Sequence, residues 1–230
     1  MKNTTQDNIK NKIEERNDIK DNIILGIDPG LKHTGWALIN KTNDGKVLYI
    51  SSGVIKNLLN NLKSGDLSDP VLRHNTLYKS NSISSDTKNI KNIKSICDIK
   101  KLLSTNKKSE NLYIALGNIF KKLNIIIQEY NPNCAAIENT YANINLESSL
   151  KLAQARAAAI IACSHNNLFL TTYQAKTIKQ TVSGNGNADK EQIKSVLPFH
   201  INNFDQFKKK KMIYDETDAI AIAICHLLKL

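Results

Sequence analysis

Residues 23–40 read IILGIDPGLKHTGWALIN, and this stretch decides the fold. The apolar run at 23–25 predicts a buried strand, and TGWALIN at 34–40 predicts a second strand after a glycine-containing turn. A third strand, at 46–55, follows the hairpin signal TNDG. Together the three segments predict an antiparallel meander, with the carboxylate of Asp28 at the end of its first strand.

From residue 110 the pattern changes to alternating helices and strands. Apolar residues recur at helical spacing, and short apolar runs lie between the helical stretches. Strands followed by such an alternation predict an α/β fold, in which a mixed sheet carries helices on its faces. The expected elements are a helix at 112–130, a strand ending at Glu138, a helix at 146–166, a strand at 168–173, two short helices on either side of 183–188, and a C-terminal helix at 215–230.

The composition is that of an ordinary globular protein. The chain has 230 residues, of which 41% are hydrophobic, enough for one sizeable domain. Its four cysteines show no CxxC spacing, which favours free thiols in a reducing compartment over a zinc site or disulfides. The first 22 residues are polar and hold no signal-peptide core, and no apolar run is long enough to span a membrane. We therefore expect a cytoplasmic protein without membrane contact.

The net charge of +11 favours a polyanionic partner, most simply nucleic acid, although a compositional bias toward Lys, Asn and Ile is the alternative. Most of the excess lies in residues 56–108, which hold eleven basic and four acidic side chains, a net +7. This segment has weak periodicity, so we expect a long loop or insertion with short helical stretches around 90–103. The predicted organisation is a polar tail at 1–22 and one domain at 23–230, interrupted at about 56–108.

Four acidic residues fall at the ends of predicted elements. Asp28 and Glu138 each end a strand, while Asp215 and Asp218 open the last helix and lie on one face of it. Simpler roles stay open at this point, since Asp215 or Glu216 would suit a helix N-terminus and Glu138 an exposed strand end. Asp218 directly precedes the apolar run AIAIAI, where a carboxylate needs a partner.

If the four carboxylates converge, they cannot all ionise without a counter-charge. Two divalent cations would supply it, because hard oxygen ligands suit Mg²⁺ or Mn²⁺. Two such ions, about 3.5–4 Å apart, can activate a water and stabilise the leaving oxygen of a phosphodiester. A basic protein with this cluster is therefore expected to be a nuclease, with two ions per subunit.

Four long segments resemble, in order, the signature segments of the RuvC family of Holliday-junction resolvases. They read GIDPGLKHTGWALI, AAIENTYANINLESSLKLAQARAAAI, TTYQAKTIKQTVSGNGNADKEQI and DETDAIAIAICH, and the resemblance covers 23–55 and 110–228. It implies a ribonuclease-H-like fold and a homodimeric, Mg²⁺-dependent endodeoxyribonuclease. Such an enzyme resolves four-way junctions by paired symmetric nicks in DNA recombination and repair. The family also implies RuvA and RuvB, the branch-migration proteins, as partners.

The resemblance assigns roles residue by residue. It places Lys179 and Lys190 on lysines used in catalysis and DNA contact, and Tyr141 on an aromatic residue that stacks on a base. Lys208 and Lys209 belong to a longer-than-usual basic run for which phosphate contact is an option and a solvated charge run the alternative. The family's catalytic metal ligands fall on Asp28, Glu138, Asp215 and Asp218.

The helix at 146–166 matches the family's dimer helix. Its small side chains would let a partner helix approach, although the sequence alone favours their burial inside the same subunit. They are Ala153, Ala155, Ala157, Ala158 and Ala159.

Two other classes compete with a resolvase. GIDPGLKHTG also resembles the first phosphate loop of actin-like ATPases and sugar kinases, but the second glycine-rich phosphate hairpin of that class is missing from the sequence. A catalytically silent junction-binding scaffold on the same fold is the remaining alternative. Such proteins usually lose an acidic ligand, and all four are present here. Lys32 and His33 stay without a role, since DNA contact and a solvated loop suit them equally.

Overall fold

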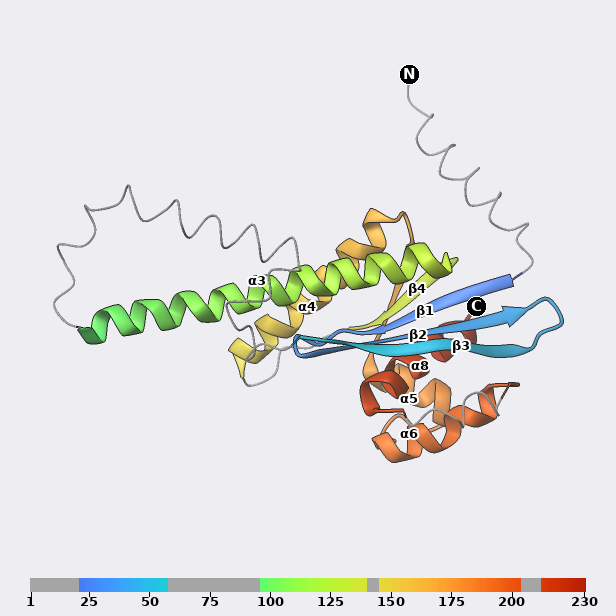
Figure 1. Cartoon of the computed structure of the whole chain (residues 1–230). Coiled ribbons are helices and arrows are strands. Elements are labelled where there is room, and N and C mark those ends of the chain that lie inside the picture. The colour runs from blue at the N-terminus through green and yellow to red at the C-terminus, as the bar shows by residue number, and fades with distance from the viewer. Residues whose placement is uncertain (1–20, 58–95, 140–144, 204–211) are drawn as a thin grey trace, which may run out of the picture. The chain divides into compact units, whose positions relative to one another are not determined.

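The computed structural model describes residues 21–57, 96–139, 145–203 and 212–230, with only the backbone described for Asp21 and 96–110 (Figure 1). Its internal contacts divide the chain into one unit of Met1–Asn57 and Leu116–Leu230 and a second of Leu58–Ala115. The sheet, the acidic residues and the helical segments from Leu116 onward all belong to the first unit. The predicted tail and most of the predicted insertion lie outside the described residues, so the predicted domain division stays a prediction.

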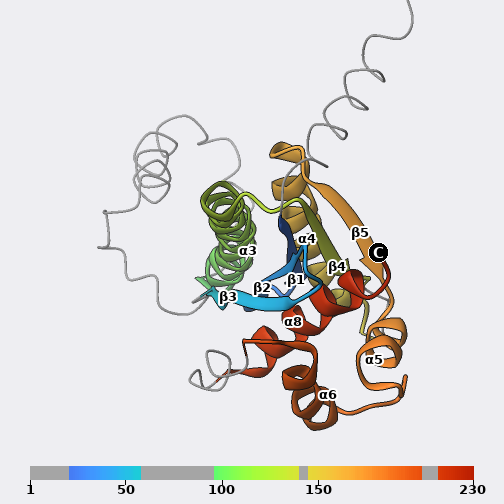
Figure 2. The ribbon, with the colours of Figure 1, turned by 90° about the vertical axis from the view of Figure 1, so that its right-hand side faces the viewer.

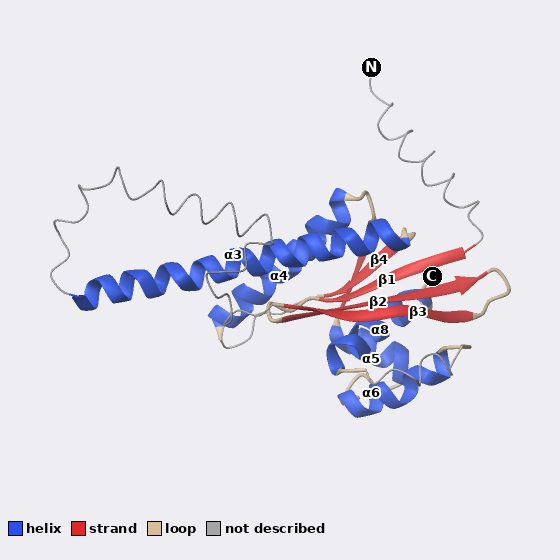
Figure 3. Ribbon diagram, in the orientation of Figure 1, coloured by secondary structure: helices blue, strands red, loops and turns tan. Residues whose placement is uncertain are grey.

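The centre of the first unit is a mixed sheet (Figure 3), whose five strands have the order β3-β2-β1-β4-β5 (Figure 2). Strands β1 (Asp21–Asp28), β2 (His33–Thr42) and β3 (Val47–Lys56) form the predicted antiparallel meander. Strands β4 (Cys134–Glu138) and β5 (Phe169–Tyr173) then add in parallel beyond β1. The prediction of a mixed sheet flanked by helices is confirmed.

The helices largely follow the sequence prediction, with one correction. Helix α3 begins at Ile96, whereas the sequence predicted a continuous helix only from residue 112 and short helical stretches around 90–103. Residues 96–111 contain neither Gly nor Pro, so nothing stops the helix there, but the eight polar residues at 104–111 interrupt the apolar spacing that would reveal one continuous helix. The helices are α3 (Ile96–Tyr130), α4 (Leu146–His165), α5 (Ala175–Ser183), α6 (Lys190–Val196), the 3-10 turn η3 (Leu197–His200) and α8 (Tyr214–Leu227). Among the described residues, no helix has the length and apolar content needed to cross a membrane.

The sheet separates two apolar cores. Leu25 and Ile27 of β1 point to one face, where Ile119 of α3 and Ala159 of α4 cover them. Ile24 points to the opposite face, which α5, α6 and α8 cover (Figure 2). Side chains along a strand alternate between faces, so Gly26 and Asp28 lie on the α8 side together with Ile24.

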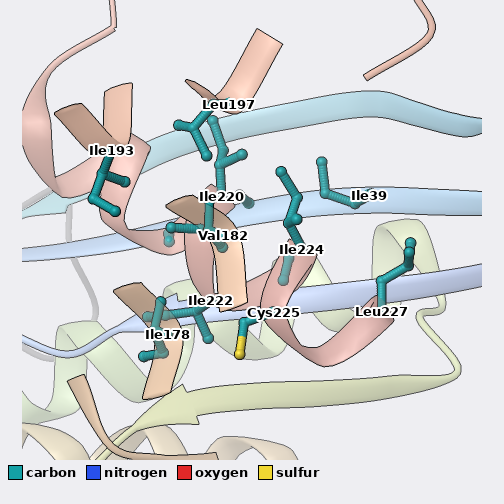
Figure 4. Close-up of a cluster of buried hydrophobic side chains, with 14 of the residues drawn as sticks. Ile39, Ile178, Val182, Ile193, Leu197, Ile220, Ile222, Ile224, Cys225 and Leu227 are labelled. Carbon is teal, nitrogen blue, oxygen red and sulfur yellow. The ribbon is translucent and has the colours of Figure 1, made fainter. Parts of the chain in front are cut away.

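Helix α8 is the buried centre of the second core. Its Ile220, Ile224 and Leu227 belong to one buried cluster with residues of α5, α6 and η3 (Figure 4). At its C-terminal end, the buried His226 is held from both ring nitrogens. Nδ1 lies 2.8 Å from Tyr173 Oη and Nε2 lies 3.3 Å from Cys134 Sγ. Cys134, Cys163 and Cys225 are free thiols, as predicted.

Two glycines let α8 lie directly on the meander. A Cβ atom at Gly26 would lie 2.1 Å from the carbonyl oxygen of Ala219 and 2.9 Å from Cβ of Ala223. A Cβ atom at Gly35 would lie 1.9 Å from the carbonyl oxygen of Asp215. These distances are far below van der Waals contact, so no side chain fits at either position while α8 stays in place.

We expect Gly26→Val to lower the free energy of unfolding by about 3 kcal/mol or more, because α8 must move away from β1. Urea unfolding, followed by circular dichroism, measures the change. Gly117→Ala in α3 is the matched control: its new Cβ meets nothing within 4 Å, so the better helix propensity of Ala should add about 0.5–1 kcal/mol. An unchanged midpoint for Gly26→Val would show that α8 does not lie against β1.

Candidate acidic active site

The sheet places Asp28 and Glu138 beside each other. Strands β1 and β4 are parallel, with Ile27 opposite Ile137, so the next residue in each strand occupies the same end of the sheet. Ala136 faces the α8 core, and Glu138, two residues on, points to the same face. Both carboxylates are only partly exposed.

Helix α8 brings the other two carboxylates to this point. Gly35 is the pairing partner of Asp28 in β2, and it is also the residue on which the backbone of Asp215 rests. Asp218 follows one helical turn later. The first turn of α8 is therefore held over the end of β1 by the backbone itself.

The alternative role of a helix cap for Asp215 or Glu216 is wrong. Ile213 is the N-cap residue of α8, and no side chain caps the helix there. Glu216 is buried instead and accepts a hydrogen bond of 3.2 Å from Ser52 Oγ of β3. Asp215 is thus left to face the acidic cluster.

The electrostatics show that the four carboxylates interact. Burial, followed by the negative charges of Asp218, Glu138 and Asp215, raises the pKa of Asp28 to about 7. Burial and the charge of Asp218 also raise the pKa of Glu138. Asp28 is the point at which the other three negative charges meet.

Two predicted lysines offset part of this charge. Lys190, the first residue of α6, donates a hydrogen bond of 2.7 Å to Asp218 Oδ2, and this bond raises the pKa of Lys190. Lys179 of α5 lies close enough to lower the pKa of Glu138, as does Lys190. The structure therefore brings both lysines to the acidic cluster. Tyr141, Lys208 and Lys209 lie outside the described residues.

Three further residues contact the cluster and were given no role from the sequence. His33 Nδ1, in the first residue of β2, lies 3.8 Å from Asp215 Oδ2. Arg156 of α4 donates a hydrogen bond of 3.2 Å to the carbonyl oxygen of Glu138 and another of 3.1 Å to Thr172 Oγ1, which ties the ends of β4 and β5 together. Tyr214 directly precedes Asp215 and contacts Lys190. His33 and Tyr214 each had a local signal, because His33 lies in the stretch GIDPGLKHTG with Asp28 and Tyr214 directly precedes Asp215.

The donor set fits a hard divalent cation in kind. It offers four carboxylates and no thiol, and a bound cation would offset both the burial and the repulsion that raise the pKa of Asp28. As they stand, no three Asp, Glu, His or Cys side chains in the described ranges are grouped tightly enough to enclose an ion. Binding would therefore require the carboxylates to draw together.

The sheet order, its antiparallel meander and the acidic residues at the ends of β1, β4 and the start of α8 define a ribonuclease-H-like fold with an acidic site. A family model described as "Crossover junction endodeoxyribonuclease RuvC" matches residues 24–96 and 90–226. The chain therefore belongs to the RuvC family.

Individual relatives agree with this membership. The chain is 31% identical over 208 residues to the crossover junction endodeoxyribonuclease RuvC of Rickettsia akari, covering 90% of this chain and 98% of the relative. It is 32% identical over 203 residues to that of Methylobacillus flagellatus, covering 88% and 85%. Thermus thermophilus RuvC, solved alone and in complex with a Holliday junction substrate, shares the fold with TM-scores of 0.57 and 0.59. Each match has 17% identity and covers 90% of this chain and 93% of that chain.

We expect the metal-free protein to lose stability as the pH rises from 5 to 8. The pKa of Asp28 is about 7 in the folded chain against 3.8 as its ordinary value, so between these values the folded state binds a proton that the unfolded state does not. The free energy of unfolding should fall by about 2–3 kcal/mol over this range. Asp28→Asn should remove most of that slope in urea unfolding with EDTA.

Asp44→Asn is the matched control for this measurement. Asp44 is an exposed carboxylate whose pKa is lowered to about 2, chiefly by a hydrogen bond from Lys46, so it stays ionised throughout. The control should keep the wild-type slope. Parallel profiles for wild type and Asp28→Asn would contradict the proposed crowding of charge at Asp28.

Proposed function

We propose that this chain is a structure-selective DNA endonuclease that resolves four-way junctions by paired symmetric nicks, in recombination and repair. The observation that carries the proposal is the convergence of three carboxylates on Asp28 at one end of a ribonuclease-H-like sheet. Membership of the RuvC family and a net charge of +11 support DNA as the substrate.

The proposed cofactor is Mg²⁺, for which Mn²⁺ would substitute, at two ions per subunit. The ligands would be Asp28, Glu138, Asp215 and Asp218, and the bound ions would activate the attacking water and stabilise the leaving oxygen. Lys190, which donates to Asp218, and Lys179, whose charge lowers the pKa of Glu138, would contact a phosphate at the cluster and offset charge that develops in the transition state. Arg156 would hold Glu138 in place through its carbonyl oxygen.

A homodimer is the second part of the proposal. Ala155, Ala158 and Ala159 of α4 are buried against the chain's own sheet, so the small residues on that face serve the subunit itself. The opposite face carries an exposed apolar stripe at helical spacing, formed by Leu146, Leu150, Ala153, Ala157 and Ile161. Leu146, Leu150 and Ile161 are each more than half exposed, which suits burial against the same helix of a second copy. A two-fold dimer would present one acidic site to each of two opposed strands.

Further parts of the proposal concern regions outside the described residues or outside the chain. Tyr141 is proposed to stack on a base, and Lys208 and Lys209 to contact phosphates. RuvA and RuvB are the proposed protein partners, and the cytoplasm is the proposed location.

We expect the purified protein to introduce paired symmetric nicks into a synthetic four-way junction in Mg²⁺ or Mn²⁺. Asp28→Asn should lower the rate by about a hundredfold or more, because the point where the ligands meet loses its charge. Junction binding should persist, as measured by a gel-shift assay. Asp44→Asn, which removes an exposed carboxylate in the β2–β3 turn, is the control and should cleave like wild type.

The other outcomes separate the competing classes. Junction binding by the wild type without nicks in either metal would favour the scaffold. ATP turnover would favour the kinase-like class.

We expect Ala157→Glu combined with Ile161→Glu to convert the dimer into monomers, since two charges would be buried at the interface. Sedimentation velocity measures the change, and junction cleavage by the variant should yield single, unpaired nicks. Ser195→Glu, at an exposed position of α6, is the control and should remain dimeric. A wild-type chain that sediments as a monomer at micromolar concentration would contradict the proposed interface.

A further inference from the structure

Tyr214 is the first residue of α8, and its side chain contacts three side chains of α6. Its hydroxyl donates a hydrogen bond to Glu191 Oε1. The ammonium groups of Lys190 and Lys194 lie 5.5 Å and 5.6 Å from the centre of its ring. Both distances are within the range of a cation–π interaction.

Lys190 is shared between this ring and the acidic cluster. Its ammonium donates to Asp218 Oδ2 at 2.7 Å while it stays near the ring. Its side chain is 60% exposed, so the surrounding core does not hold it in one rotamer. A lysine on a flexible four-carbon stem loses much rotamer freedom when it is fixed, and an ion pair at an exposed position gives little in return.

The backbone of α6 is fixed separately. Asp189 accepts a hydrogen bond from the backbone N–H of Gln192, and the side chain of Gln192 accepts one from the backbone N–H of Asp189. This capping box sets where α6 begins, and hence where the Cα atom of Lys190 lies. It does not set the direction of the Lys190 side chain, which leaves that task to Tyr214 and Asp218.

We infer that Tyr214 is a positioning residue that keeps the ammonium group of Lys190 at the acidic cluster, and that its aromatic ring performs this task. The inference rests on the proposed function for its catalytic consequence, but not for its structural one. A cation bound by Asp218 would displace Lys190 from the carboxylate. The ring of Tyr214 would then keep the ammonium group within reach of a phosphate at the same site. Without the ring, the Lys190 side chain would turn into solvent.

The first test needs neither metal nor DNA. The protein in EDTA is acylated briefly with an N-hydroxysuccinimide ester, and each lysine is quantified by peptide mass spectrometry with the exposed Lys229 as internal reference. Loss of the ring in Tyr214→Leu should raise the acylation rate of Lys190 about two- to fivefold, the factor expected for an exposed cation–π contact. Tyr214→Phe keeps the ring and should stay within twofold of wild type.

The second test measures junction cleavage by the same variants. Tyr214→Leu should lower kcat about two- to fivefold and leave KM within twofold. Tyr214→Phe should have the kcat of wild type. Tyr214→Met repeats the loss of the ring with a second good helix former, so a folding defect in one variant does not decide the result. Phe199→Leu is the matched control, since it removes an aromatic ring that is 87% exposed on η3, and it should change neither readout.

Equal acylation of Lys190 in wild type, Tyr214→Leu and Tyr214→Met would overturn the inference. It would also fail if Tyr214→Phe behaved like Tyr214→Leu, because the hydrogen bond to Glu191 and not the ring would then position Lys190. A wild-type protein that does not nick junctions would refute the proposed function, whereas the acylation result would still decide the role of Tyr214.

Discussion

The structure depends on the close approach of one helix to two strands. Helix α8 lies against β1 and β2 at Gly26 and Gly35, where a single added carbon would meet its backbone. Small residues on the helix side, Ala219 and Ala223, complete this contact. Packing of this density leaves little freedom in the position of the helix. The same contact fixes the position of the first turn of α8, and therefore the positions of the carboxylates of Asp215 and Asp218.

The consequence is a site that concentrates negative charge against its own electrostatic preference. Asp28 is partly buried and has three other carboxylates around it, and its raised pKa reflects the free-energy cost of ionising it there. Lys190 and Lys179 relieve the cost only in part. Such an arrangement lowers folding stability at neutral pH without a counter-ion, which is typical of a site selected for binding and chemistry. The apolar cores on both sides of the sheet supply the stability that tolerates it.

The alanines of helix α4 lie on two different faces of the helix. Its alanines were compatible with a partner helix or with burial inside the subunit. The structure buries Ala155, Ala158 and Ala159 against the sheet and leaves Ala153 and Ala157 on an exposed stripe with three large apolar residues. Arg156 projects between these faces and holds the end of β4. An interface on the outer face of α4 would therefore lie one residue away from a side chain that contacts Glu138.

The sequence by itself determined which segments form the strands and most of the helices, the antiparallel meander, and the four acidic positions at the ends of these elements. Those features depend on local periodicity and turn residues, which a sequence displays directly. The sequence did not reveal that α3 is continuous from Ile96, because the polar residues at 104–111 interrupt the apolar spacing. Only the tertiary structure decided that Ile213 caps α8, that His33, Arg156 and Tyr214 reach the cluster, and that Lys190 pairs with Asp218. These contacts join residues from separate elements, and their distances follow from how closely α8 packs on the sheet, which no local pattern encodes.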